Sequence, residues 1–324
     1  MKLRGVVLLV FLLAGGVSVA RAQQSIDLAS ISGRVTDPSG AVVPGAQVVV
    51  RHVQTNVSST AVTDADGRFR FPYLRIGPYE LVVSLDGFEE ARRELTLTAG
   101  AAFELPVTLA LAKVSTGVTV VSEAPVLETA RSQVATTVAV EEVRTIPLNG
   151  RNFLELALLV PGVSPTNVAS TQLFPETSAV PGITLSVGSQ RNFSNNFIVD
   201  GLSANDDAAG LSGITYSVDA IDQVQVITSG GQAELGRALG GYVNIVTKSG
   251  TNVPQGTAYT YVRDDRLNAA NPLLRDKLPM NQVQYGGSLG GPIVASRTFY
   301  FANVERRNLD QTGLVTISPS DVAA

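Results

Sequence analysis

The chain has 324 residues, no cysteine and one histidine, and its 24 basic and 28 acidic residues give a net charge of −4. The lack of cysteine excludes disulfides, thiolate zinc sites and iron–sulfur clusters. One histidine cannot build a histidine-rich metal site, and the weakly acidic balance disfavours a nucleic-acid-binding surface. We therefore expect no metal, no cofactor and no nucleic-acid partner in a chain long enough for two or three domains.

Residues 1–22 have the pattern of a secretory signal peptide. Lys2 and Arg4 precede an apolar run from Val6 to Leu13, and the tripeptide Ala20-Arg21-Ala22 fits an A-x-A cleavage site. The apolar run is too short for a stable membrane span, although an N-terminal anchor helix is the alternative. We expect the mature chain to be exported.

Short β-rich runs follow between residues 30 and 112, and turn clusters such as DPSG and DADG separate them. Such runs at intervals of about 8 to 12 residues predict a β-sandwich. Val48 and Val50 alternate with Gln47, Val49 and Arg51. The runs are ISGRVT, AQVVVRHV, SSTAVT, RFRF, YELVVSL, RRELTL and ELPVTLAL, and the predicted core comprises Phe69, Phe71, Tyr79, Leu81 and Val83.

The spacing of glycine, aspartate and apolar residues in this segment resembles the carboxypeptidase regulatory-like domain. That resemblance implies a non-catalytic sandwich without zinc ligands. The matching positions include Gly33, Val35, Asp37, Gly40, Gly45-Ala46, Asp66-Gly67, Leu74, Gly77 and Gly87-Phe88. The single histidine, His52, is expected to be a surface strand residue, and the DADG cluster at Asp64–Gly67 a hairpin turn rather than a calcium loop.

Residues 113–133 form a connector with an isolated strand-forming run. Val118, Thr119, Val120 and Val121 have no hairpin partner beside them, and Glu123 and Pro125 end the run. An unpaired strand can extend the sheet of another protein. In position and composition the run resembles the TonB box of outer-membrane transporters, which implies contact with TonB and its inner-membrane energising complex. An ordinary sandwich strand or an inert linker is the alternative.

The pattern changes between residues 134 and 250. An early acidic helix is expected before Pro147, and a second helix is expected after Asn152, with Glu155 placed as in a capping box and Pro161-Gly162 as the stop. Strands are expected at Phe197–Val199, at Gln223–Ile227 and at Tyr242–Thr247.

This stretch resembles the plug domain of TonB-dependent outer-membrane transporters, and the preceding sandwich makes it most similar to the Oar-like subgroup. The sequence departs from the family pattern at Ser229-Gly230-Gly231, Leu235 and Asp222. The matching positions are Ile146-Pro147, Gly150-Arg151-Asn152, Leu156, Pro161-Gly162-Val163, Val199-Asp200-Gly201, Ile221, Val224, Val226, Gly230, Leu235-Gly236, Gly240-Gly241, Val243-Asn244-Ile245 and Thr247-Lys248.

The glycine pair Gly240-Gly241 precedes a β-branched strand. Glycine weakens a strand and marks a place where another backbone approaches closely. We expect such an approach here. Asn244, in the middle of the apolar run, is expected to face a polar partner rather than the core.

Residues 251–324 have the alternation of outer-membrane barrel strands. Val283, Tyr285 and Leu289 are expected on one face, opposite the polar residues Gln282, Gln284 and Ser288. TAYTYVR and RTFYFANVE are further candidates, and Phe299, Tyr300 and Phe301 suit an aromatic girdle. Only 324 − 250 = 74 residues remain after residue 250. They suffice for three or four strands of a barrel that has roughly 22. We therefore expect a mainly β fold comprising a sandwich, an α+β plug and a few strands of an incomplete transmembrane barrel.

Three functions fit these observations. The first is the N-terminal part of a TonB-dependent transporter in the Gram-negative outer membrane, which gates uptake or export of a small molecule, glycan or peptide and contacts membrane lipid in its full-length form. The periplasm is the alternative location for the truncated chain. The second is an adhesion or binding protein that uses the sandwich, with a vestigial plug. The third is a periplasmic enzyme using Asp206 and Asp207, but no catalytic constellation supports it.

Two loops of the plug, residues 190–196 and 202–213, are candidates for contact with the substrate. Their composition suggests polar or anionic groups on the ligand. The candidate substrate-binding residues are Arg191, Asn192, Asn195, Asn205 and Asp206.

Overall fold

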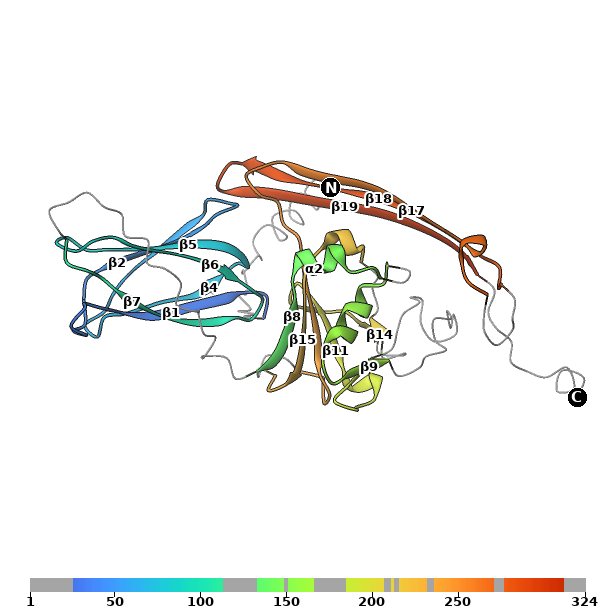
Figure 1. Ribbon diagram of the computed structural model, residues 1–324, viewed down its shortest axis with the longest axis horizontal. Coiled ribbons are helices and arrows are strands. Elements are labelled where there is room, and N and C mark those ends of the chain that lie inside the picture. The colour runs from blue at the N-terminus through green and yellow to red at the C-terminus, as the bar shows by residue number, and fades with distance from the viewer. Residues whose placement is uncertain are drawn as a thin grey trace, which may run out of the picture.

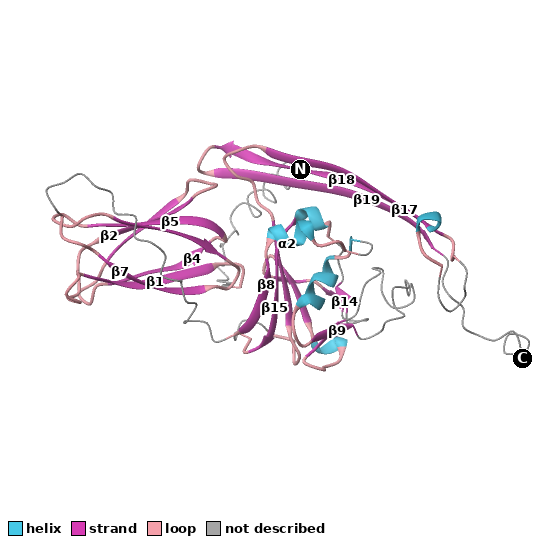
Figure 2. Ribbon diagram, in the orientation of Figure 1, coloured by secondary structure: helices cyan, strands magenta, loops and turns pink. Residues whose placement is uncertain are grey.

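The computed structural model describes residues 26–112, 133–148, 151–165, 185–206, 211–212, 216–231, 236–270 and 277–311. Three bodies follow one another along the chain (Figure 1): a sandwich domain up to residue 112, a central α+β domain from 133 to 250, and a C-terminal sheet from 255 to 311. For the central domain we keep the name plug domain, after the resemblance described above. Strands dominate all three (Figure 2), so the expected mainly β fold class is confirmed. Within these ranges no helix has the length and apolar character needed to cross a membrane. The predicted signal peptide and the run from Val118 to Val121 lie outside the described residues.

The sandwich domain has two facing sheets, and each of the seven predicted β-rich runs forms a strand. One sheet has the order β4-β1-β7, with β1 parallel to β7, and the other has the antiparallel order β3-β2-β5-β6. The strands are β1 (Ala29–Thr36), β2 (Gln47–His52), β3 (Ser58–Val62), β4 (Arg68–Leu74), β5 (Gly77–Ser84), β6 (Ala91–Leu97) and β7 (Ala102–Thr108).

Alternation along these strands builds the core between the two sheets. Val48 and Val50 are fully buried, and their neighbours on β2 point the other way, as predicted. The five predicted core residues all belong to one buried cluster. The DADG segment is a hairpin turn, in which Asp64 Oδ1 accepts the amides of Asp66 at 2.9 Å and Arg68 at 2.8 Å.

The plug domain is built on a five-stranded sheet with the order β12-β11-β16-β15-β8, in which only β11 and β16 are parallel. Three short helices cover one face of it. The sheet strands are β8 (Val134–Val138), β11 (Asn196–Val199), β12 (Leu202–Ser203), β15 (Ile221–Ser229) and β16 (Tyr242–Thr247). The helices are α2 (Val140–Thr145), η2 (Phe153–Leu159) and η4 (Val218–Ala220). Smaller elements complete the domain: β9 (Val163–Pro165), β10 (Leu185–Val187), η3 (Asn192–Ser194), β13 (Asn205–Asp206) and β14 (Leu211–Ser212).

The two faces of this sheet differ in composition. Val224, Val226 and Ile245 pack with Phe153 and other helix residues in one apolar cluster. The opposite face carries buried amide side chains, including Gln225 and Asn244, and it points toward the sandwich domain (Figure 1). Asn244 therefore has the polar surroundings expected from its sequence context.

The second expected helix of the plug is a 3₁₀-helix rather than an α-helix. Asn152 caps it as predicted, since its side chain accepts the amide of Leu154 at 3.1 Å. The segment is seven residues long and ends before Pro161 and Gly162, the latter with a φ of 84°. A helix this short is shaped by the packing of its buried residues more than by propensity.

The glycine pair before β16 is required by the close approach of other chain segments. A Cβ on Gly241 would lie 2.5 Å from Cγ1 of Val187 and 2.7 Å from the carbonyl oxygen of Ile227. A Cβ on Gly240 would lie 2.7 Å from Oδ1 of Asn195. The close approach predicted at this pair is confirmed, and it joins β10 and β15 to the start of β16.

The C-terminal sheet consists of three long antiparallel strands that pass over the plug (Figure 1). They are β17 (Gln255–Asp264), β18 (Met280–Val294) and β19 (Thr298–Gln311). A short 3₁₀-helix, η5 (Asp265–Leu267), directly follows β17. Gln282 and Gln284 are buried, whereas Tyr285 and Leu289 are exposed, so the predicted alternation on β18 is confirmed. A spanning β-strand needs about 9 to 11 residues, and each strand reaches that length.

The expected aromatic girdle on β19 is only partly formed, because successive strand residues face opposite sides. Tyr300 lies on the exposed face with Val304. Phe299 and Phe301 are half-buried on the other face, so they turn away from the surface on which a girdle would lie.

Candidate functional site

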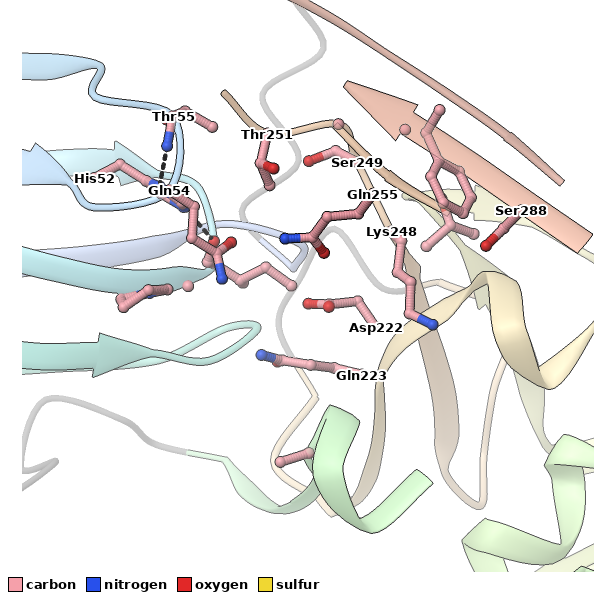
Figure 3. A pocket seen from close by; sticks show the side chains of 18 of the residues that line it. His52, Gln54, Thr55, Asp222, Gln223, Lys248, Ser249, Thr251, Gln255 and Ser288 are labelled. Atoms are coloured by element: carbon pink, nitrogen blue, oxygen red, sulfur yellow. Dashed lines mark hydrogen bonds between the residues drawn. The ribbon is translucent and has the colours of Figure 1, made fainter. Parts of the chain in front are cut away.

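A polar cavity of about 990 Å³ lies where the three bodies meet (Figure 3). Each body contributes side chains to it, so the cavity exists only in the assembled arrangement. Its lining includes His52, Gln54 and Thr55 from the sandwich domain, Asp222, Gln223 and Lys248 from the plug domain, and Gln255 and Ser288 from the C-terminal sheet.

His52 shapes the sandwich side of the cavity, and its expected surface position is wrong because the side chain is 5% exposed. Its Nδ1 accepts the amide of Thr55 at 3.3 Å, so Nε2 carries the proton and donates to the carbonyl of Ile76 at 3.1 Å. Burial lowers the pKa of this histidine, which favours the neutral form that both hydrogen bonds require. His52 thus fixes the loop between β2 and β3.

Lys248 and Asp222 form the charged side of the cavity on the plug domain. The Lys248 ammonium donates to the carbonyl of Asp219 at 2.6 Å. Burial lowers the pKa of Lys248, and the neighbouring Arg144 adds to this effect. Burial raises the pKa of Asp222, while the charge of Lys248 acts in the opposite direction. Asp222 replaces the glutamate expected in the plug pattern, and it lies where its carboxyl faces the cavity.

Arg151 joins the plug domain to the C-terminal sheet. It has a φ of 55° and forms an ion pair of 2.5 Å with Asp219. Its guanidinium also lies over the ring of Tyr261, 4.0 Å from the centroid, and 5.5 Å from that of Tyr259. An arginine over an aromatic face is attracted by the ring quadrupole. One side chain therefore binds both an acid of the plug and two tyrosines of β17.

Tyr259 extends this contact into a chain of hydrogen bonds. Tyr259 donates its hydroxyl proton to Glu305 at 2.7 Å and lies 2.8 Å from the hydroxyl of Ser217 in the plug. Arg307 on β19 reaches the carbonyl of Arg151 at 3.5 Å. These contacts between the plug domain and the C-terminal sheet are thus hydrogen bonds with defined directions, and not apolar packing.

Asp200, in the Val-Asp-Gly motif, ties two plug motifs together. Its φ is 46°, and its two carboxylate oxygens accept the amide of Thr247 at 2.9 Å and the hydroxyl of Thr247 at 2.7 Å. The motif therefore holds the end of β16, directly before Lys248. These two hydrogen bonds give the aspartate of the Val-Asp-Gly motif a structural role.

The predicted substrate-binding residues occupy different environments. Arg191 is exposed and Asn192 half-buried at the start of η3, and Asp206 is half-buried on β13, opposite Leu211. Asn195 is 4% exposed and donates to the carbonyl of Leu185 at 2.7 Å. Asn205 accepts the amide of Phe197 at 2.7 Å. The structure therefore brings Arg191 and Asn192 to the surface of one loop, whereas Asn195 and Asn205 hold backbone within the plug.

Several residues that join the three bodies have no recognisable role in the sequence. Arg151 lies in the Gly-Arg-Asn motif, but its tyrosine partners lie more than a hundred positions later. Asn252, in the turn before β17, binds both the sandwich domain and the C-terminal sheet. Among these residues, only Asn244 could be singled out from the sequence, because it is a lone amide side chain within an apolar strand.

Two family models match the chain. The carboxypeptidase regulatory-like domain matches residues 30–110, and the outer membrane beta barrel domain matches residues 246–323. Over 317 residues the chain is 30% identical to the TonB-dependent transporter Oar of Myxococcus xanthus, and the match covers 92% of this chain and 28% of Oar. The chain thus spans less than a third of the length of this curated relative.

Two receptors are among the solved structures that match part of the chain. The siderophore receptor PirA from Acinetobacter baumannii aligns with a TM-score of 0.42 and 19% identity, over 56% of this chain and 25% of that one. The ferric enterobactin receptor PfeA from Pseudomonas aeruginosa aligns with a TM-score of 0.40 and 19% identity, over 54% of this chain and 24% of that one.

Proposed function

We propose that this chain, which belongs to the Oar-like TonB-dependent transporters of the Gram-negative outer membrane, gates passage of a substrate through the barrel of such a transporter. The family is one of transporters and not of enzymes. The activity of the whole protein, its direction of transport and its partners are part of the proposal, because the chain spans 28% of its relative.

The observation that carries the proposal is the contact of Arg151 with the C-terminal strands. A gate must close the lumen at rest and be released by a limited input of energy. A polar contact built on one arginine, one aspartate and two tyrosines suits this purpose, because it fixes the plug in one orientation without a large apolar interface. Charge-assisted pairs of this kind give orientation more than net stability.

TonB, with its energising complex, is the proposed source of that energy. The run from Val118 to Val121 precedes the plug in sequence and has the composition of a strand that pairs through its backbone. Outward of the plug, the exposed Arg191 and its neighbour Asn192 are proposed to contact polar or anionic groups of the substrate.

The test uses the transporter that carries this chain, produced in cells with and without TonB. Influx of a large hydrophilic dye, normally excluded by the outer membrane, measures whether the lumen is closed. We expect the wild type to exclude the dye and Arg151→Ala to admit it, since the plug loses its hold on β17. Arg70→Ala is the matched control, because this exposed arginine lies on β4 of the sandwich domain, outside the contact between plug and C-terminal sheet, and should leave the lumen closed.

If Arg151→Ala, present in the membrane at the wild-type level, excluded the dye as well as the wild type does, this contact would not hold the gate. Adhesion through the sandwich domain would then be the better account. Dye influx that was already high in the wild type would contradict gating itself.

A further inference from the structure

The plug sheet has a face that recognises another part of this chain. Three amide side chains, Gln223, Gln225 and Asn244, project from the face opposite the helices, and all three are buried. Buried amides carry a cost unless they are hydrogen-bonded, so their partners define what this face binds.

The first partner is a single backbone residue of the sandwich domain. The amide of Ala99 donates to Oε1 of Gln223 at 3.0 Å, and the carbonyl of Ala99 accepts from Nε2 of Gln225. Both backbone groups of Ala99 are therefore satisfied by the plug. The next residue, Gly100, has a φ of 65°, and a Cβ there would lie 3.3 Å from Nε2 of Gln225. The loop between β6 and β7 fits these two glutamines closely.

The second partner is the start of the sandwich domain. Asn244 donates to the carbonyl of Ile26 at 3.3 Å, and the Ile26 side chain packs against Ile198 and Ile227 of the plug sheet. The amide of Gly100 donates to the carbonyl of Leu28 at 3.1 Å, which links the two contacting segments. This end of the sandwich thus presents one continuous surface to the plug sheet.

A separate contact holds the other side of the same sandwich end. Asn252 donates its backbone amide to the carbonyl of Gln54 at 3.0 Å and its side-chain amide to the carbonyl of Thr55 at 2.7 Å. Its Oδ1 accepts the amide of Ser296, in the turn between β18 and β19, at 2.7 Å. His52 fixes the loop that presents these carbonyls, as described above. One asparagine therefore joins the sandwich domain to the C-terminal sheet.

We propose that the sandwich domain is docked on the plug as an intramolecular clamp, held at the amide face of the plug sheet and at Asn252, and that both contacts open before the plug moves. The occupant of the amide face is the chain's own sandwich domain. The proposal concerns the docking of two domains and is independent of what the transporter carries.

The clamp has a mechanical consequence for the connector. Residues 113–132 join the last described residue of the sandwich to the first of the plug, and they include the run from Val118 to Val121. With both domains docked, a pull on that run acts on two bodies that are bound to each other. Release of the sandwich from the plug is then the first step, and displacement of the plug is a later one.

Amide hydrogen exchange at single-residue resolution tests the docking in the intact chain. The amide of Ala99 donates to the plug, whereas the amide of Gly100 donates within the sandwich, so the first reports docking and the second is an internal control. We expect slow exchange at both in the wild type. The double variant Gln223→Ala and Gln225→Ala should speed exchange of Ala99 by about tenfold or more, the effect of losing roughly 1.4 kcal/mol of protection, and leave Gly100 unchanged.

Two further measurements keep the outcome unambiguous. The amides of Val226 and Val243, on paired positions of β15 and β16, report whether the plug sheet of the variant is still folded. Gln47→Ala changes an exposed glutamine on β2 and should alter none of these rates. For the second contact, Asn252→Ala should speed exchange of the Ser296 amide, which donates to the lost side chain.

Fast exchange of Ala99 in the wild type would overturn the proposal. So would a double variant in which Ala99 stays protected while the plug sheet remains folded. Loss of protection at Val226 and Val243 as well would show that the amide face supports the plug itself and does not act as a dock. Failure of the dye experiment would leave the exchange result intact, so the two proposals are tested separately.

Discussion

The Asn244 side chain donates to the carbonyl of Ile26 at 3.3 Å across the boundary between the plug and sandwich domains, and the same amide influences the carboxyl of the next residue, Asp27. Burial raises the pKa of Asp27 to about 6, the Asn244 amide opposes this, and the charge of Asp200 adds to it. Burial makes the charged form of this carboxyl less favourable than it is in water. The clamp therefore contains a group that titrates near the pH of a mildly acidic medium.

This gives a prediction for pH. Because the pKa of Asp27 is raised from 3.8 to about 6 in the docked chain, the docked state binds more protons between these values. Docking should be tightest below about pH 4, weaken as the pH rises toward 6, and level off above it. The ratio of Ala99 to Gly100 exchange rates measures this, since the intrinsic pH dependence of exchange largely cancels in the ratio.

Asp27→Asn is the control for that titration. The variant keeps the shape of the side chain but carries no charge, so the difference between wild type and variant should change between about pH 4 and 6 and stay constant above about pH 6. A difference that did not change between pH 4.5 and 7.5 would contradict the assignment to Asp27. Asp222, whose pKa is also raised by burial, is present in both proteins and does not enter the difference.

The glycine at the start of β16 gives a prediction for stability. Gly241→Ala would place a methyl group 2.5 Å from Val187 and 2.7 Å from the Ile227 carbonyl. Overpacking of this kind typically costs 1 to 3 kcal/mol, so we expect the free energy of unfolding of the plug to fall by about that amount. Gly236→Ala is the matched control, since a Cβ there meets nothing within 4 Å. Denaturant unfolding followed by circular dichroism compares the two, and equal stability of both variants would refute the close-approach explanation.

The sandwich core gives a second prediction for stability. Phe71 is 5% exposed, and Phe71→Ala should destabilise the sandwich domain by about 3 to 5 kcal/mol. Tyr73 lies two residues further along the same strand and is 48% exposed, so Tyr73→Ala should cost much less. Melting of the sandwich in each variant, followed by amide exchange at β2 and β5, makes the comparison. A loss smaller than about 1 kcal/mol for Phe71→Ala would mean that the core tolerates the cavity.

The connector gives a prediction for the partner. If the run from Val118 to Val121 pairs with TonB through its backbone, Val120→Pro should abolish binding, because proline lacks the amide donor. Val120→Ile keeps the donor and should bind like the wild type. Capture of the transporter by the immobilised periplasmic part of TonB measures both. Equal capture of the proline variant and the wild type would exclude backbone pairing at this position.

The elements of each domain were accessible from the sequence, but the contacts between domains were not. Alternation on β2 and β18 predicted which side chains are buried, because the period of a strand is visible in a few residues. By contrast, Gln223 and Gln225 bind Ala99 through its backbone, and that residue lies more than 120 positions away. Every residue type has a backbone carbonyl and all but proline have an amide, so the sequence does not show which residue is bound in this way. The η2 segment shows the same limit, because capping and stop signals predict where a helix begins and ends but not its pitch.

The pairing of β1 has a consequence for the order in which the sandwich forms. β1 lies between β4 and β7, and its parallel partner β7 ends at Thr108. In a chain that is synthesised and exported N-terminus first, the central strand of this sheet emerges about 70 residues before one of its two neighbours. Closing such a long loop is slow, and a strand that waits with an unpaired edge is prone to pair wrongly. The β4-β1-β7 sheet can therefore close only after residue 108 has arrived, and until then β1 keeps one edge without its partner strand.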